Sequence, residues 1–199
     1  MTTPLRLALF IDGQNAYRRA RALFFPNTRS ARDGQFRPMD LGRRIAGRGG
    51  PNGVPCILSD VRVYSGEPDA RRDPRTYAAH RRQTQRWASD GATVTTRALR
   101  YPRGWPATPA QEKGVDVALA VDFVKLAIEG EYDIGVMMST DNDLLPVLEV
   151  VRNHDPGRTH VAVAAWSAPG HHQRLRLPGL WCHWLDRADY DAVADPTRY

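Results

Sequence analysis

The chain has 199 residues, of which 42% are hydrophobic and 25% charged, and its formal net charge is +6. This size and composition fit one globular domain with a hydrophobic core and exclude collagen-like, fibrous and fully disordered chains. No apolar run approaches the roughly 20 residues that a membrane span needs. The two cysteines, Cys56 and Cys182, make neither a disulfide framework nor a zinc site. We therefore expect a cytoplasmic protein that does not bind a membrane.

Charge is distributed unevenly along the chain. Residues 1–110 contain 20 Lys and Arg against 8 Asp and Glu, whereas residues 111–199 contain 8 against 14. Arginine supplies 26 of the 28 basic residues, and its planar guanidinium can bind phosphate through two hydrogen bonds. The basic first half fits a polyanionic partner or a solvated surface combined with codon bias, and charge alone does not decide between them.

The first third of the chain predicts a strand, a helix and a long insertion. A short apolar strand is expected at 5–11, where an Asp-Gly pair ends it, and a helix follows at 15–25. The stretch 27–60 is rich in Gly, Pro and Arg and is expected to be a long surface insertion. Within it, Asp40 is the expected N-cap of one short helix that ends at residue 46.

The remaining elements continue the alternation of strands and helices. In chain order we predict a strand at 61–65, a helix at 74–89, a strand at 92–98, a helix at 115–128, a strand at 134–139, a helix at 142–152, a strand at 160–166, an edge strand at 180–185 and a short helix at 188–194. The segment 100–109 is expected to be an exposed loop, and a short extension follows residue 167. This alternation predicts an α/β fold, with a mostly parallel central sheet and helices on both faces.

Acidic side chains follow two of the predicted strands. Asp12 follows the first strand, and Asp141 and Asp143 follow the strand at 134–139. Because the carboxyl ends of parallel strands meet at one edge of a sheet, these acids are expected to converge, and Asp116 can reach the same edge from a helix start. Clustered carboxylates repel one another and favour a hard cation such as Mg²⁺ or Mn²⁺.

Each acid also has a structural interpretation. Asp12 can be a turn residue, Asp141 can be a helix N-cap, and Asp116 is a first-turn residue that the helix dipole favours. The joint occurrence of these acids at strand ends, in a chain that is otherwise basic, favours the metal site.

Three sequence blocks resemble the motifs of the NYN domain. The blocks are Phe10-Ile-Asp-Gly-Gln-Asn-Ala-Tyr17, Lys113-Gly-Val-Asp-Val-Ala-Leu-Ala-Val-Asp122 and Met138-Ser-Thr-Asp-Asn-Asp-Leu-Leu-Pro146. Their order and spacing match as well, and the resemblance covers about residues 5–166. NYN proteins include the LabA-like group and are similar to PIN-domain nucleases.

The resemblance implies a Rossmann-like PIN fold and a ribonuclease that depends on Mg²⁺ or Mn²⁺. It carries the family's metal site over onto Asp12, Asp116, Asp141 and Asp143, with Asn15 as a polar neighbour and Lys113 beside the substrate phosphate. One departure is Thr140, which stands where the family usually has glycine, so a side chain could narrow the cleft there. The whole chain is then expected to be a single NYN domain.

The predicted reaction is the hydrolysis of phosphodiester bonds in single-stranded RNA by a metal-activated water. Substrate binding is assigned to Lys113, Arg82, Arg86, Arg100 and Arg103. Tyr101 and Trp105 would offer stacking faces to bases, although packing of Trp105 beside prolines is equally open.

Other functions remain as alternatives to this prediction. A noncatalytic RNA-binding module on the same fold is the main one, and a homo-oligomer is left open. An aspartyl-phosphate phosphatase is disfavoured because Gln14 stands where that enzyme needs a second acid. A dinucleotide-dependent oxidoreductase is disfavoured because no Gly-x-Gly-x-x-Gly motif follows the first strand.

Overall fold

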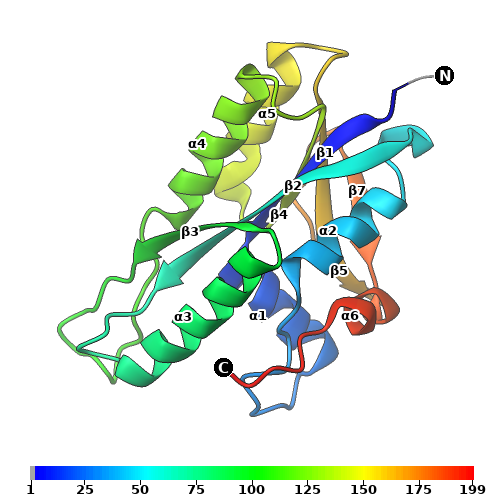
Figure 1. The fold of residues 1–199 in the computed structure, drawn as a ribbon. Coiled ribbons are helices and arrows are strands. Elements are labelled where there is room, and N and C mark those ends of the chain that lie inside the picture. Colours follow the sequence, from blue (N-terminus) through cyan, green and yellow to red (C-terminus); the bar gives the residue numbers. More distant parts are fainter. Residues whose placement is uncertain (1–2) are drawn as a thin grey trace.

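The computed structural model describes residues 3–199 and shows a mostly parallel sheet between two layers of helices (Figure 1). The strands are β1 (Leu5–Asp12), β2 (Cys56–Glu67), β3 (Thr93–Ala98), β4 (Ile134–Met138), β5 (His160–Ala168), β6 (His171–His172) and β7 (Trp181–Leu185). The helices are α1 (Gly13–Phe24), α2 (Pro38–Gly47), α3 (Pro74–Ser89), α4 (Val115–Ile128), α5 (Leu145–His154) and α6 (Arg187–Val193), with 3₁₀ turns η1 (Pro51–Gly53) and η2 (Asn142–Leu144). The predicted α/β fold with a mostly parallel sheet is therefore confirmed.

Strand β1 lies inside the sheet, between β2 and β4. The strand order is β3-β2-β1-β4-β5-β6, and β7 also pairs with β5. These pairings are parallel except for the short antiparallel contact between β5 and β6. The chain builds outward from β1 to β3 and then crosses through α4 to β4 on the other side of β1. The direction of winding reverses between β1 and β4, which is where open α/β sheets bind ligands.

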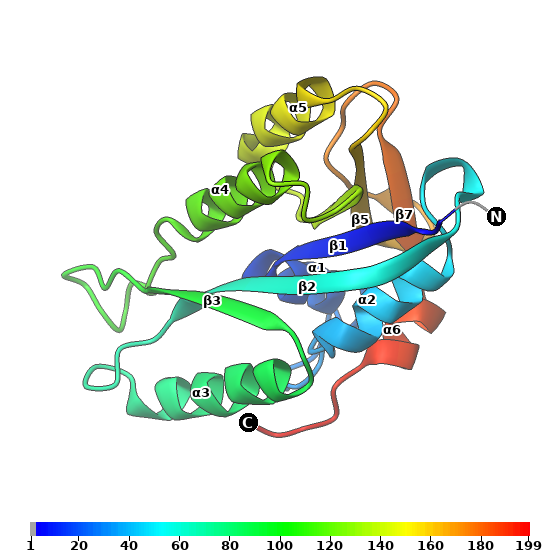
Figure 2. The ribbon, with the colours of Figure 1, turned by 45° about the horizontal axis from the view of Figure 1, so that its top comes forward.

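The two faces of the sheet are covered by different helices. Figure 2 shows α4 and α5 on one side of the sheet, with α1, α2, α3 and α6 on the other. Along β1, Leu7, Leu9 and Ile11 belong to the core beneath α1, α2 and α6, whereas Ala8 and Phe10 belong to the core beneath α4 and α5. Successive strand side chains alternate between faces, so burial of both faces explains the continuous apolar run of this strand.

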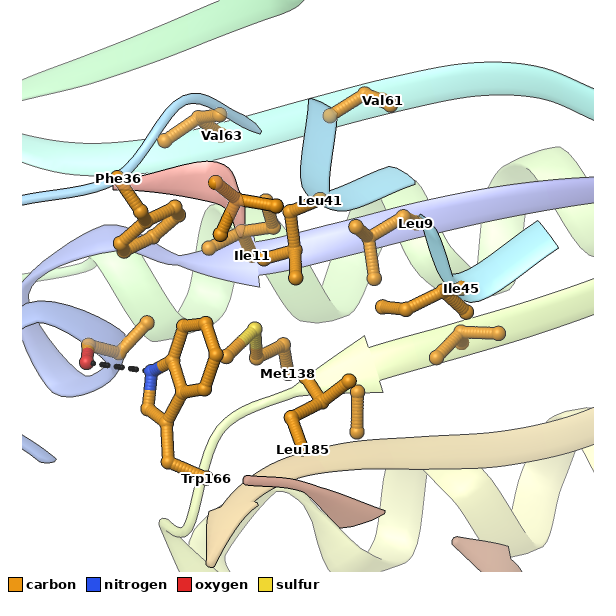
Figure 3. Close-up of a cluster of buried hydrophobic side chains, with 14 of the residues drawn as sticks. Leu9, Ile11, Phe36, Leu41, Ile45, Val61, Val63, Met138, Trp166 and Leu185 are labelled. Carbon is orange, nitrogen blue, oxygen red and sulfur yellow. Dashed lines mark hydrogen bonds between the residues drawn. The ribbon is translucent and has the colours of Figure 1, made fainter. Parts of the chain in front are cut away.

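Trp166 anchors helix α1 against strand β5. The residue is almost fully buried, and its indole Nε1 donates to the carbonyl oxygen of Ala16 at 3.1 Å (Figure 3). The rings of Phe24, Phe36 and Tyr190 pack around it. A buried indole N–H needs a hydrogen-bond partner, so this bond fixes the position of the helix that follows β1.

The prediction that residues 27–60 form a surface insertion is wrong for part of this segment. Phe36, Leu41 and Ile45 are buried in the core under the sheet. The apolar positions of α2 form a narrow stripe between arginines and glycines, so the overall composition of the segment hides its buried face.

Several predicted boundaries also change. Helix α2 begins at Pro38 with Arg37 as its N-cap, so the assignment of Asp40 as the N-cap is wrong, and Asp40 lies in the first turn. Strand β2 begins at Cys56, before the predicted start at residue 61. The prediction missed residues 56–60 because they are half-exposed and lack a strong apolar pattern.

The segment after residue 167 is also part of the folded core. Strand β7 continues the sheet beside β5, as predicted for the edge strand at 180–185. Helix α6 contributes Tyr190 and Val193 to the same core as α2. None of the helices in the described residues 3–199 is long and apolar enough to cross a membrane.

The burial of α2 predicts a large effect of truncating its apolar stripe. Leu41→Ala should lower the free energy of unfolding by about 2–5 kcal/mol, because it leaves a cavity in the core. Arg43→Ala on the same helix is the control, because its ion pair with Asp40 is exposed and should contribute at most about 1 kcal/mol. Urea unfolding of both variants measures the difference, and equal losses would contradict a buried α2.

Candidate active site

Asp12 stands at the carboxyl end of β1 and is also the N-cap of α1. Its Oδ1 accepts a hydrogen bond from the Asn15 backbone N–H at 3.1 Å, and its Oδ2 accepts one from the Ser139 hydroxyl at 3.1 Å. Burial raises the pKa of Asp12 despite both hydrogen bonds, and the charges of Asp141 and Asp116 raise the pKa further. The structure therefore brings these three acids to one edge, and Asp12 is the most enclosed of them.

A second set of contacts joins the start of α1 to the turn after β4. The side-chain oxygen of Asn15 accepts hydrogen bonds from the backbone N–H and the hydroxyl of Thr140, both at 3.1 Å. The Ser139 hydroxyl also accepts from the backbone N–H of Asp141 at 3.1 Å. Asn15 thus acts on the positions of the acids through the turn, and Thr140 adds a hydroxyl contact that a glycine would lack.

The other predicted acids are more exposed than Asp12. Asp141 caps η2, where its Oδ1 accepts from the backbone N–H of Asp143 at 3.0 Å. Asp116 is the second residue of α4, and its charge is near enough to raise the pKa of Asp12. Asp143 and Lys113 are exposed, and neither side chain makes a hydrogen bond or ion pair within residues 3–199. The structural N-cap role of Asp141 and its place in the acidic edge therefore coexist.

Glu112 is a further acid at this edge that the sequence analysis missed. Its Oε1 accepts a hydrogen bond from the backbone N–H of Gly66, at the end of β2, at 2.7 Å. Burial raises the pKa of Glu112, and the charges of Asp12 and Asp116 raise the pKa as well, while Arg18 lowers it. Glu112 comes from a loop with no regular pattern, and its position depends on a contact with a strand 46 residues earlier. The only local feature of the sequence that could have marked Glu112 as a site residue is its position directly before Lys113.

The predicted phosphate-binding arginines lie on two separate segments. Arg82 and Arg86 are exposed on α3, and Arg86 forms an ion pair with Asp90 at 3.1 Å. Arg100 and Arg103 are exposed on the loop after β3, where the backbone of Arg100 pairs with that of Gln111. These four side chains are accessible to a polyanion.

The aromatic residues of this loop are engaged with one another. Tyr101 and Trp105 pack edge to face, with ring centroids 4.9 Å apart, and the Tyr101 hydroxyl accepts from the backbone N–H of Asp69 at 2.9 Å. Trp105 therefore packs against Tyr101 within its own loop, and the stacking of bases on these rings stays a prediction.

The chemistry of the acidic edge fits a hard divalent cation. Its donors are carboxylate oxygens, and a bound positive charge would offset both the burial and the acidic neighbours that raise the pKa of Asp12. Within residues 3–199, no three His, Cys, Asp or Glu side chains are placed to hold a metal ion together. Mg²⁺ commonly binds through one or two carboxylates and keeps several waters, so such a cation does not need a closed protein cage.

This combination of fold and site defines a class of protein. A mostly parallel sheet with helices on both faces, and carboxylates at the switch between β1 and β4, is a Rossmann-like α/β fold of the PIN type. The chain belongs to the NYN domain family, whose sequence model matches residues 6–176. The predicted family and the PIN-like fold are therefore confirmed.

Comparison with solved structures agrees with this fold. A crystal structure of a protein of unknown function from Vibrio parahaemolyticus aligns with a TM-score of 0.51 over 97% of this chain and 93% of that chain, at 14% sequence identity. At this identity the similarity shows the fold alone. Comparison with curated proteins finds no match.

The raised pKa of Glu112 predicts a stabilising substitution. At neutral pH, Glu112→Gln should raise the melting temperature in EDTA, because it removes one charge from a repelling cluster and keeps the acceptor for Gly66. A raised folded-state pKa means that the stability contributed by this group falls as the pH rises through that pKa. The gain should therefore shrink as the pH is lowered and the carboxyl becomes protonated in both states.

Glu149→Gln is the matched control, because Glu149 is exposed on α5. It should leave the melting temperature nearly unchanged across the same pH range. A lower melting temperature of Glu112→Gln at neutral pH would instead assign the carboxylate a stabilising structural role.

Proposed function

We propose that this NYN domain is a metal-dependent ribonuclease that hydrolyses phosphodiester bonds of single-stranded RNA in the cytoplasm. The observation that carries the proposal is the enclosed carboxylate of Asp12, whose pKa is raised by burial and by the charges of Asp141 and Asp116. The burial of a carboxylate and its repulsion by neighbouring acids cost stability, and groups with perturbed pKa values in clefts mark candidate functional sites. The membership of the chain in a PIN-like family agrees with a nuclease.

The acids have distinct proposed roles. Asp12, Asp116, Asp141 and Asp143 are the proposed ligands of Mg²⁺ or Mn²⁺, with one or two of these carboxylates bound to the cation directly and the others through its water molecules. Such a cation supplies an activated water and neutralises charge on the phosphate. Glu112 would add negative charge on the side toward β2, where it contacts Gly66.

Polar neighbours would position these groups and the substrate. Ser139 and Asn15 hold Asp12 and the turn after β4 in place through the hydrogen bonds described above. Lys113 lies three residues before Asp116 on an exposed segment, so its ammonium can bind the phosphate next to the acids. Hydrolysis breaks the P–O3′ bond, and the products carry a 5′-phosphate and a 3′-hydroxyl.

Exposed arginines would bind the rest of the RNA chain. Arg82 and Arg86 share one side of α3 at a spacing of four residues, and Arg100 and Arg103 extend the basic surface on the neighbouring loop. The alternative is an RNA-binding module without catalysis. That module would use the same arginines but would leave RNA intact with any divalent cation.

Removing the charge of Asp12 separates the enzyme from the binding module. Asp12→Asn should reduce the cleavage of labelled single-stranded RNA by about two orders of magnitude or more, a loss typical of removing one group that stabilises the transition state. RNA binding should persist or tighten, because a carboxylate no longer repels the phosphate. Parallel assays with Mg²⁺, with Mn²⁺ and with EDTA measure both quantities.

Asp191→Asn on the exposed surface of α6 is the control and should cleave like the wild type. Cleavage that survives both Asp12→Asn and EDTA would come from a contaminating nuclease. A wild type that binds RNA but cleaves it under none of these conditions would establish the binding module instead.

Reversing two arginines of α3 tests the RNA-binding surface. Single-stranded binding loses about 0.7 in the slope of log K against log salt for each phosphate contact removed, so Arg82→Glu with Arg86→Glu should flatten the slope by about 1.4. Arg158→Glu is the control, because Arg158 lies before β5, on the other side of β1 from β3 and α3. Equal slopes for the double variant and the wild type would make α3 a solvated surface only.

A further inference from the structure

A cavity of about 650 Å³ lies next to the acidic edge. Its walls come from the start of α1, the inner side of α3, the end of β2 and the loop before α4. Figure 2 shows α1 and α3 on the same side of the sheet. The cavity shares Gly13, Gln14 and Glu112 with the surroundings of Asp12. A volume of this size is typical of sites that bind small organic ligands.

Three buried polar atoms without a partner belong to residues that line this cavity. They are Gln35 Oε1, His80 Nδ1 and Trp87 Nε1, and in the described residues 3–199 only His183 Nε2 shares this condition. Trp87 is only 7% exposed. Buried polar atoms are nearly always hydrogen-bonded, and leaving one unpaired costs about 1–3 kcal/mol. These atoms lie just beneath the cavity surface, so their concentration around one cavity points to side chains that turn toward a polar ligand to complete their bonds.

The chemistry of the walls selects a flat, polar-edged ligand. Tyr17, Phe36 and Trp87 supply aromatic surface. Turned toward the cavity, the unpaired atoms would supply an indole donor, an amide acceptor and an imidazole nitrogen, which is a donor or an acceptor according to its tautomer. Burial lowers the pKa of His80, so its ring is neutral at pH 7, and Nε2 lies 3.2 Å from the Ser65 hydroxyl. Nucleobases combine flat faces with donors and acceptors on their edges.

A cation near the cavity completes the match to a nucleotide. Arg18 lines the cavity and lies close enough to Glu112 for its charge to act on that carboxyl group. A base held in the cavity would place its own phosphate beside this guanidinium and close to Asp12. We propose that the cavity binds the base of one nucleotide of an RNA strand, turned out of the strand, and so positions the neighbouring phosphate at the acidic edge.

This inference rests on the proposed function only in its claim that the bound nucleotide positions a phosphate for cleavage. Nucleotide binding itself can be measured without cleavage. The probes are the four ribonucleoside 5′-monophosphates and an RNA octamer, added in EDTA to the Asp12→Asn protein. The readout is the indole N–H resonance of Trp87 in ¹H–¹⁵N spectra, which Trp87→Phe identifies by its absence. At least one monophosphate and the octamer should shift this resonance.

Two substitutions test where the nucleotide binds. Ala79→Phe fills the cavity from α3 and should weaken monophosphate binding at least tenfold, whereas Ala88→Phe, exposed on the same helix and not part of the cavity wall, should not. Trp87→Phe removes the indole donor and keeps an aromatic ring, so calorimetry should show binding about 2- to 10-fold weaker, as expected for one hydrogen bond. The Trp87 variant keeps the test usable if the larger side chain impairs folding.

Each outcome decides the proposal. Equal binding by Ala79→Phe and Ala88→Phe, or no shift with any probe, would overturn it and leave the cavity to solvent. A shift with a monophosphate but not with the octamer would also overturn it, because the cavity would then hold a free nucleotide. Cleavage without nucleotide binding would refute only the base site, and nucleotide binding without cleavage would refute only the ribonuclease.

Discussion

The register of β1 against β4 is the constraint on which the rest of the site depends. Ile11 and Met138 are the last paired residues of this parallel register, so the residues that follow them, Asp12 and Ser139, lie side by side. The 3.1 Å hydrogen bond between them follows from this register. A shift of one residue would turn Ile11 out of its core and separate Asp12 from Ser139. The apolar residues of β1 therefore position the acid that follows them.

The same edge concentrates negative charge that the fold alone does not require. Burial makes ionisation of Asp12 and Glu112 harder, the charge of Asp116 acts on both in the same direction, and the charge of Asp12 acts so on Glu112. The hydrogen bonds from Asn15, Ser139 and Gly66 and the charge of Arg18 near Glu112 counter this effect. Natural proteins accept such local costs mainly at functional sites, where stability and activity conflict. The mostly basic surface of the first half of the chain then brings a polyanion toward a cleft that would otherwise repel it.

The sequence predicted those parts that local patterns determine. The apolar run of β1 and the arginine-rich helix α3 were predicted to within a residue or two, and α4 with its Asp116 was predicted over its full length. The burial of Leu41 was not predicted, because a narrow apolar stripe among arginines and glycines resembles a surface helix. Glu112 was missed for a different reason, since only the folded chain brings the loop before α4 to the end of β2. The acids at the strand ends could thus be predicted from local sequence patterns. The cavity wall and the position of Glu112 could not, because they depend on long-range packing.

Two glycines connect the acidic edge with the cavity beside it. A Cβ on Gly13 would lie 3.0 Å from the Tyr64 carbonyl oxygen, so the missing side chain lets α1 start against β2 directly after Asp12. A Cβ on Gly66 would lie 2.3 Å from Leu99 and 2.9 Å from the Glu112 carboxylate oxygen, so this glycine admits both neighbours. The start of α1, the end of β2 and the loop before α4 all line the cavity. Because Gly13 follows Asp12 and Gly66 binds Glu112, the contacts that shape the cavity also position two acids, and the geometry of a bound nucleotide and the geometry of the acids cannot vary independently.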